Sequence, residues 1–574
     1  MRRLLPLLVM MNLTLIILLS GCSDIEDIAG LFVAPEEEES LPSAYIAPTP
    51  EGTFPQEMST AARILARGEM VVGVRYDLEP FSYITADSEL AGLEIDLARE
   101  LARRWLGNPD AVRFRQVRSD SAFQHLKNGT VDIVLAGVAH TQEMEAQADF
   151  SPPYFTNGLA FLTFPDTNIQ GIGELTGRNI GVVTWTGSRA ALEATTGLSA
   201  TYTAYEHFFD VVDALRLRQV DVYADQRHRL ERARRTVVGS IIVGQTTREP
   251  VAMLYREDDP FFYNLVTLTF QDMVADGTRD ALYARWLPDT SPPSVVLMGG
   301  DAPTPALAAS PSELSVLDVP ARIRARGTLA VGYFQDRWPY CGDRADGVPT
   351  GFEVRLLERV AERWLGDRQA ITFIPVTAAD AIQRLQQGEF DLLAGTWIRT
   401  RNAELGADFS IEIVDDGVSI FSLGAAPIED LAMLNGQAVG VVAGSDGERA
   451  LPALSQSAGV AVSSARYPDF AAALDGLRQG AVSAIITERG PALNVHFREE
   501  GYFITERRYT HRPVSYVVPE GDSAFRDLLN LTLMALQTNG VYQELYGLWF
   551  DDAMPVLETW PGQPAIPLII ASTP

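Results

Sequence analysis

The chain repeats itself at a constant offset of 259 residues. Asp77-Leu-Glu-Pro80 matches Asp336-Arg-Trp-Pro339, and Ala148-Asp-Phe-Ser151 matches Ala407-Asp-Phe-Ser410 at the same spacing. Repeats that stack into a solenoid are only about 20 to 50 residues long, whereas this period has the length of a whole domain. The sequence therefore predicts two copies of one domain.

Composition suits two folded domains and excludes one class of partner. The 574 residues are 47% hydrophobic and 21% charged, which is ordinary for globular proteins and ample for two cores. The formal net charge is −29, and the basic residues are spread singly along the chain. Because such a surface repels a phosphate backbone, we expect no nucleic-acid partner.

The first 22 residues indicate export and anchoring. Met1-Arg-Arg-Leu4 and the apolar run to Leu19 give a charged start and a hydrophobic region too short for a stable membrane span. Leu19-Ser-Gly-Cys22 is similar to the bacterial lipobox, in which cleavage precedes the cysteine and its thiol carries lipid. We therefore predict extracytoplasmic localisation with a lipid anchor at Cys22. Cys341 is then the one remaining thiol, so no intrachain disulfide is expected.

Proline-rich segments separate the two copies from each other and from the ends of the chain. Residues 23–58 contain Glu36-Glu-Glu-Glu39 and lack a sustained apolar period, while Pro292-Pro293 and Gly299-Gly300 lie between the copies. We expect a stalk, and a linker that leaves the domains free to move. The predicted division is a lipoprotein signal peptide at 1–21, a disordered stalk at 22–58, a first domain at 59–288, a Pro-rich linker at 289–317, a second domain at 318–552 and a loosely packed tail at 553–574.

Each copy alternates short apolar runs with helical patterns, which is typical of strand–helix units on a mostly parallel sheet. In the first copy the predicted order starts with a strand over 70–74 and continues with a helix over 94–104. This helical segment carries an apolar stripe at every fourth residue from Leu93 to Trp105. We expect an α/β fold in which the stripe lies on the sheet, with Trp105 and Trp364 in the cores.

Three motifs recur in the same order in both copies. Gly92-Leu-Glu-Ile-Asp-Leu97 and Gly351-Phe-Glu-Val-Arg-Leu356 open a helix, an Ala-Asp-Phe-Ser segment follows, and each copy closes with a helix containing Tyr-x-x-Trp. In this order the motifs resemble the family 3 solute-binding proteins of ABC importers, the polar amino-acid type. The resemblance implies two tandem periplasmic-binding-protein type II domains, each with two α/β lobes, a hinge and an interlobe cleft that closes on a solute.

The resemblance also implies a carboxylate-binding arginine that neither copy keeps in place. In amino-acid-binding members this arginine forms a bidentate pair with the carboxylate of the ligand. Alignment without gaps from the Asp-Phe-Ser anchor puts Met144 and Ala403 at that position. Arg399 is close enough to reach into the cleft, or is a solvated loop residue. Thr141 and Thr400 keep the family's threonine and are expected to donate a hydrogen bond to the ligand.

Other ligand-binding positions carry over from the family by their place in the motifs. Glu488 matches the acid that meets the ammonium group of the ligand, and Asp225 is the candidate in the first copy, although its segment is one residue shorter. Phe81 and Tyr340 either stack on the ligand or pack between the lobes. Asp77 and Asp336 are further candidates, which line the cleft or cap a turn. Thr186 and Ser445 lie at a helix N-terminus suited to a carboxylate. In the first copy Trp185 precedes Thr186 and either stacks on a ligand or blocks it.

These features predict a binding protein without a cofactor. We expect a lipid-anchored protein that captures a small polar, amino-acid-like solute for an ABC transporter permease or for sensing. One alternative is an enzyme on the same fold, similar to the dehydratases, with His140 and Asp77 as acid–base candidates. Another is a scaffold in which one or both clefts, the first in particular, have lost ligand binding. The sequence contains no phosphate loop or Cys–His metal cluster, so neither a nucleotide nor a metal is expected.

Overall fold

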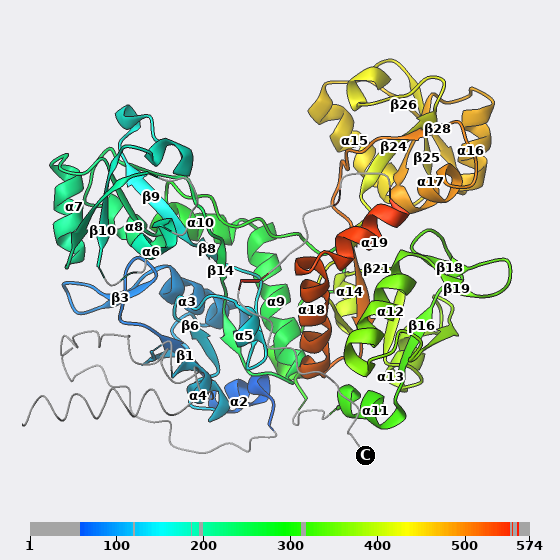
Figure 1. Cartoon of the computed structure of the whole chain (residues 1–574). Coiled ribbons are helices and arrows are strands. Elements are labelled where there is room, and N and C mark those ends of the chain that lie inside the picture. The colour runs from blue at the N-terminus through cyan, green and yellow to red at the C-terminus, as the bar shows by residue number, and fades with distance from the viewer. Residues whose placement is uncertain are drawn as a thin grey trace, which may run out of the picture.

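The computed structural model describes residues 58–118, 121–184, 186, 188–193, 199–311, 317–550, 554 and 560–561. The predicted signal peptide, Cys22 and nearly all of the predicted stalk lie outside these residues. Among the described residues, no helix is long and apolar enough to cross a membrane. Two α/β domains follow one another along the chain, and each consists of two lobes (Figure 1).

The first lobe of domain 1 is built on a five-stranded sheet whose strands come from both ends of the domain. The central strand β1 (Met70–Val74) pairs in parallel with β5 (Val112–Gln116) and β6 (Ile133–Leu135). β15 (Leu254–Tyr255) pairs antiparallel with β6 and with β7 (Asp149–Phe150). Because β15 lies far along the chain from β7, the chain leaves this lobe to build the second one and then returns.

Two segments cross between the lobes of domain 1. They are β8 (Phe155–Asn157) and β14 (Glu249–Val251), which pair antiparallel as a two-stranded ribbon. A narrow two-segment connection between compact lobes is the geometry of a hinge. The sheet of the second lobe has the order β11 (Thr201–Tyr205), β10 (Asn179–Val183), β12 (Val222–Gln226), β9 (Leu159–Thr163) and β13 (Ile241–Val243).

Domain 2 repeats both lobes, which confirms the predicted duplication and the α/β fold with two lobes in each domain. Strand positions keep the 259-residue offset as far as β10 and its counterpart β25 (Ala438–Val442), and the offset then grows to 262 residues at β11 and β12 and to 263 residues at β15. The first sheet has the order β20 (Ile371–Pro375), β16 (Leu329–Tyr333), β21 (Leu392–Ile398), β29 (Pro513–Val518) and β22 (Asp408–Phe409), and the second has the order β26 (Ser463–Tyr467), β25, β27 (Ala484–Glu488), β24 (Val418–Leu423) and β28 (Tyr502–Ile504).

The two amphipathic helices predicted from the apolar stripe are α3 (Leu93–Leu106) and α12 (Phe352–Leu365), which pack on the first sheet of their domains. Each helix ends at a glycine with positive φ, Gly107 at 73° and Gly366 at 77°, where a residue without Cβ adopts the left-handed conformation freely. Trp364 is 1% exposed, as predicted, and its Nε1 donates to Thr532 Oγ1 at 2.8 Å. The stripe therefore forms part of the core in both domains.

The two domains meet through a pair of helices in the middle of the molecule, α9 (Pro260–Ala275) and α18 (Ser523–Thr538) (Figure 1). Arg526 on α18 forms an ion pair with Asp149 of domain 1, and its guanidinium carbon lies 4.7 Å from the ring centroid of Tyr263 on α9. In the opposite direction, Asn264 on α9 donates to the Glu404 carbonyl oxygen of domain 2 at 3.0 Å. Equivalent elements of the two copies thus face each other across the interface.

Carboxyl groups outnumber cations in this interface. Asp149, Asp408 and Asp527 are each at most 3% exposed, and Arg526 is 4% exposed. Burial raises the pKa of Asp149 above its ordinary value, and the Arg526 guanidinium opposes that shift. Burial likewise raises the pKa of Asp408 to about 6. Because an unpaired charge is costly in such a place, the interface depends on Arg526 for its charge balance.

The linker and part of the tail pack against the domains. The Met298 amide donates to Gln271 Oε1 on α9 at 2.8 Å, and Thr304 donates to Asp272 Oδ2 at 2.5 Å. Trp560 is 7% exposed, and its ring lies 4.1 Å from the His140 ring of domain 1. The described parts of the linker and the tail therefore pack against the domains, whereas we predicted a freely moving linker and a loosely packed tail.

Replacing Arg526 is expected to destabilise the domain pair. In Arg526→Met the carboxyl groups of Asp149 and Asp527 lose their buried counter-charge, and removing one partner of a buried pair costs about 3 kcal/mol or more. Urea unfolding of the full chain at neutral pH measures this loss. Arg478→Met is the control, because Arg478 is 40% exposed and its pair with Glu499 lies at the surface; an equal effect of both substitutions would contradict the role given to Arg526.

Candidate ligand-binding cleft

A cavity of about 640 Å³ lies between the two lobes of domain 2. Its first wall comes from the loop after β16 and from the end of β21, its floor from the two hinge segments, and its second wall from α16 (Phe470–Arg478), the end of β27 and α17 (Arg489–His496). A cavity of this size suits a small-molecule ligand. Aromatic rings line much of it, namely Phe334, Trp338, Tyr340, Trp397 and Phe470.

A bulge in β21 turns the first wall toward the cavity. Its pairing with β29 shifts register between Leu393 and Trp397, and Gly395 there has a φ of 126°. A Cβ on Gly395 would lie 2.3 Å from Phe334 Cδ2, so only glycine fits. The bulge places Trp397 against Phe334, with 5.5 Å between the ring centroids.

A buried carboxylate holds this bulge. Glu353 accepts the amide N–H of Gly395 at 2.6 Å and that of Thr396 at 2.8 Å. Burial raises the pKa of Glu353 to about 7, and the two amide hydrogen bonds work against that rise. Glu353 therefore fixes the shape of the first wall without reaching the ligand space.

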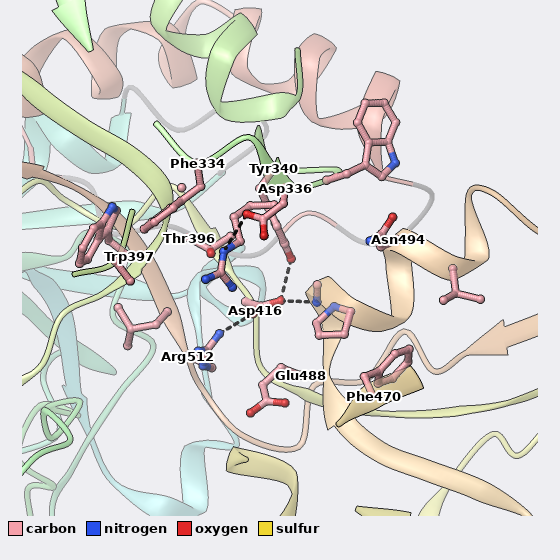
Figure 2. A pocket seen from close by; sticks show the side chains of 18 residues that line it. Phe334, Asp336, Tyr340, Thr396, Trp397, Asp416, Phe470, Glu488, Asn494 and Arg512 are labelled. Atoms are coloured by element: carbon pink, nitrogen blue, oxygen red, sulfur yellow. Dashed lines mark hydrogen bonds and ion pairs between the residues drawn. The ribbon is translucent and has the colours of Figure 1, made fainter. Parts of the chain in front are cut away.

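Asp416, on the first hinge segment, ties the two lobes and the hinge together. Its Oδ1 accepts Tyr340 Oη at 2.8 Å from the first lobe and the Gly490 amide at 2.7 Å from the second. Its Oδ2 accepts Arg512 Nη1 from the other hinge segment at 2.5 Å. Figure 2 shows Asp416 between Tyr340 and Arg512, with these contacts dashed. Asp416 is 2% exposed, and burial raises its pKa above the ordinary value.

Arg512 donates hydrogen bonds to two aspartates. Besides its bond to Asp416, its Nε donates to Asp446 Oδ2 at 2.7 Å, at the start of α15 (Asp446–Ala458) in the second lobe. Burial works to lower the pKa of Arg512, but Asp416, Glu488 and Asp446 together raise it. The guanidinium thus stays charged and is held by the protein's own carboxylates.

Glu488 faces the cavity from the end of β27 (Figure 2). Its Oε1 accepts the Asp446 amide at 2.6 Å, which is one of the free N–H groups at the N-terminus of α15. Its Oε2 accepts Thr487 Oγ1 at 3.3 Å. Among the described residues, no arginine, lysine or histidine nitrogen lies within 4.0 Å of this carboxylate.

The structure places three of the predicted ligand residues of domain 2 along the cavity and three elsewhere. Asp336, Tyr340 and Glu488 line it. Ser445 is the N-cap of α15 and accepts the Glu448 amide at 3.1 Å, which is a capping role.

The structure places Arg399 and Thr400 outside the cavity. Arg399 donates to Glu404 Oε2 at 2.8 Å and to Tyr263 Oη of domain 1 at 2.8 Å, so it belongs to the domain interface. Thr400 caps the short helix α14 (Arg401–Glu404) through the Ala403 amide. The bulge in β21 directs this segment away from the cleft.

In domain 1, Asp225 is not the counterpart of Glu488. Alignment through β12 and β27 pairs Asp225 with Thr487 and makes Gln226 the counterpart of Glu488, since Gln226 and Glu488 face equivalent positions on β9 and β24. Asp225 is fully buried, where it accepts hydrogen bonds from Tyr223 Oη and from Ser188 Oγ. Its carboxylate therefore serves the interior of the lobe.

The other predicted residues of domain 1 make contacts within the protein. Asp77 receives two hydrogen bonds from Arg75, each 2.8 Å long, and Phe81 is 2% exposed against Phe155. Thr186 donates to the Val183 carbonyl at 3.0 Å. Thr141 precedes the short helix α5 (Gln142–Glu145), next to the domain interface. Trp185 lies outside the described residues.

Ion pairs of the protein itself cross the cleft of domain 1. Arg232 on α8 (Arg227–Arg234) in the second lobe lies 3.5 Å from Glu79 in the first lobe, and Arg235 lies 3.6 Å from the same carboxylate. The aromatic wall of domain 2 is not repeated, because Arg75 and Val138 stand at the positions of Phe334 and Trp397. The two clefts are therefore chemically different.

Sequence reasoning missed Asp416, Arg512, Trp397 and Phe470. The first two lie on hinge segments that carry no periodic pattern, and Trp397 reaches the cavity only because of the bulge. A comparison of the copies would have helped, since Tyr340 and Asp416 stand where domain 1 has Phe81 and Asn157.

The sequence profile of bacterial extracellular solute-binding proteins, family 3, matches residues 70–289 and again residues 329–552. The chain belongs to this family. Both domains are thus family 3 solute-binding domains, and the cavity of domain 2 lies in the interlobe cleft of one of them.

Several family members are similar over part of the chain. A glutamine-binding protein of Geobacillus stearothermophilus is 31% identical over 134 residues, which is 23% of this chain and about half (51%) of that relative. The glutamine-binding protein GlnH of Bacillus subtilis (strain 168) is 24% identical over 240 residues, 41% of this chain and 88% of its own length. Among solved structures, an ancestral cationic amino acid solute-binding protein is 28% identical, with a TM-score of 0.36, over 40% of this chain and 99% of its own.

Removing the central carboxylate is expected to destabilise domain 2. Asp416→Asn loses the charge that holds Arg512, and Tyr340→Phe leaves one oxygen of Asp416 with a single donor. Hydrogen bonds to buried charged groups are worth about 1.5 to 3 kcal/mol, so each substitution should lower the free energy of unfolding by that order. Urea unfolding measures it. Tyr502→Phe is the control, because its hydroxyl pairs at the surface, and a comparable loss there would contradict the assignment.

Proposed function

We propose that the chain is a lipid-anchored extracytoplasmic solute-binding protein whose second domain captures a small polar, amino-acid-like solute for an ABC importer or for sensing. The observation that carries the proposal is the cavity of domain 2, which lies between two hinged lobes and is lined by aromatic and charged side chains. Family membership supports it, as do relatives described as glutamine-binding, arginine-binding and L-cystine-binding proteins.

Binding would proceed by closure of the lobes about the hinge. A ligand shifts the balance between open and closed forms only by binding the closed form more tightly, so it must touch both lobes. Trp397 and Asp336 offer contacts from the first lobe, and Glu488 and Phe470 offer contacts from the second. Asp416 already links both lobes to the hinge and would set the axis of the motion.

Domain 1 is proposed to support the assembly rather than to bind the solute. Its cleft is crossed by ion pairs from Arg232 and Arg235 to Glu79. The acid–base candidates of the enzyme alternative are also engaged elsewhere: Asp77 pairs with Arg75, and His140 contacts Glu145 at 2.5 Å in the domain interface. Neither lines the cavity of domain 2.

Titration of the full chain in detergent tests the binding proposal. Isothermal calorimetry and thermal unfolding against amino acids, amines, organic acids and short peptides should find a ligand with one site per chain. At a hundredfold excess over the dissociation constant, that ligand adds about 2.7 kcal/mol to the stability of the domain that holds it. Two equal sites would contradict the role given to domain 1, and no response to any compound would contradict the proposal.

Anchoring is tested by replacing the proposed lipid attachment residue. Wild-type protein expressed in a bacterium should incorporate labelled fatty acid and sediment with membranes. Cys22→Ser lacks the thiol that carries the lipid, so labelling should be lost and the protein should appear in the soluble extracytoplasmic fraction. Cys341→Ser is the control, since this buried thiol is not available to an acylating enzyme. Fatty-acid labelling of Cys22→Ser would contradict the anchor.

A further inference from the structure

A cleft that binds a free amino acid needs a receptor for the α-carboxylate, which is a free guanidinium group or the open N-terminus of a helix. In domain 2 the guanidinium of Arg399 is withdrawn to the domain interface, where it holds Glu404 and Tyr263. The cavity is thus without the arginine nearest to the expected position. Two other arginines, Arg337 and Arg512, line the cavity.

Both arginines that line the cavity have a carboxylate of the protein nearby, Arg512 through hydrogen bonds and Arg337 through a longer, exposed ion pair. Arg512 donates to Asp416 and Asp446, at 2.5 and 2.7 Å. Arg337 lies 3.7 Å from Asp336 and stacks over Phe334, with 5.0 Å between its guanidinium carbon and the ring centroid. A ligand carboxylate would have to compete with these attached groups for either cation.

Side chains of the protein also occupy the N-terminus of α15 in the second lobe. The carboxylate of Glu488 accepts the Asp446 amide of α15 at 2.6 Å, and Ser445 accepts the Glu448 amide. A negative side chain of the protein therefore occupies the place where the helix dipole would favour an anionic ligand. The same side chain, Glu488, brings a carboxylate to the cavity that has no ion-pair partner within 4.0 Å among the described residues.

The other groups of the cavity suit a positive charge. The faces of aromatic rings attract cations, and Trp397, Phe334 and Phe470 contribute such rings from both lobes. Figure 2 shows Glu488 and Phe470 on the side of the cavity opposite Trp397 and Phe334. Asn494 adds an amide oxygen, Oδ1, that is buried and accepts no hydrogen bond from the described part of the chain.

We infer that the cleft of domain 2 binds an amino-acid-derived cation that lacks a carboxylate, an amine or guanidine whose charge lies against Glu488 and between the aromatic walls. The inference rests on the proposed function, since it names the class of solute for the same cavity. The rival occupant is a zwitterionic amino acid. Its carboxylate would accept hydrogen bonds from the Trp338 and Trp397 Nε1–H groups, which find no acceptor among the residues that the structure describes.

Calorimetric titration of the full chain with agmatine and arginine separates the two occupants, because the two compounds share a guanidinium and differ in the carboxylate. Putrescine, glutamine and glutamate complete the set. Agmatine is expected to bind about tenfold more tightly than arginine, because the extra carboxylate of arginine meets Glu488 and Asp416 without a free guanidinium or an open helix N-terminus to hold it. Putrescine should bind, and glutamate should not.

Glu488→Gln keeps the acceptor for the Asp446 amide and removes the charge. It should weaken agmatine binding about 10-fold to 100-fold, the equivalent of one hydrogen bond to a charged group. Glu429→Gln is the matched control, because Glu429 is an exposed glutamate of the same lobe that does not line the cavity, and it should leave agmatine binding unchanged. Urea unfolding of both variants shows whether they remain folded.

Each outcome distinguishes the inference from the function on which it rests. Tighter binding of arginine than of agmatine, or binding of glutamine or glutamate alone, overturns the inference and leaves solute binding intact. Agmatine binding that Glu488→Gln does not weaken overturns the assigned contact. Failure of every compound in this set and in the wider panel overturns the proposed function, and the inference with it.

Discussion

Arg526 is the buried cation on which the arrangement of the two domains depends. It sits on α18, pairs with Asp149 of the other domain and lies over the ring of Tyr263, at 4% exposure. Around it the interface buries more carboxyl groups than cations, so its guanidinium offsets much of the negative charge that would otherwise be buried where α9 and α18 meet. The same interface explains why Arg399 is absent from the cleft: it supplies a second cation where the carboxyl groups gather.

The duplication and the α/β class could be predicted from long-range repetition and apolar periodicity, whereas the two lobes and the hinge were implied by the resemblance to the family. The 259-residue offset fixed the equivalence of β1 with β16 and of α3 with α12, and both pairs occupy equivalent places in the structure. The offset failed only after β10, where the loops differ in length by three residues. That difference displaced the alignment at Asp225, whose neighbour Gln226 is the true counterpart of Glu488.

Much of the site could not be predicted, because its residues meet only through tertiary structure. Trp397 depends on a bulge in β21, and Asp416 and Arg512 come from two hinge segments far apart in the sequence. Asp416, Arg512 and Tyr340 form one network of charge and hydrogen bonds. Domain 1 has Phe81, Asn157 and Glu249 at the corresponding places, so the network differs as a whole between the copies and not at one position.

The ion pairs across the cleft of domain 1 have a consequence for any solute that reaches it. Glu79, Arg232 and Arg235 belong to one chain, so each faces its partner at the effective concentration of a tethered group, on the order of millimolar for short connections. A solute that bridges the lobes through the same charges has to displace these tethered side chains. Its apparent dissociation constant in domain 1 is raised by the free energy needed to break these exposed pairs, which is about 1 kcal/mol or less for each.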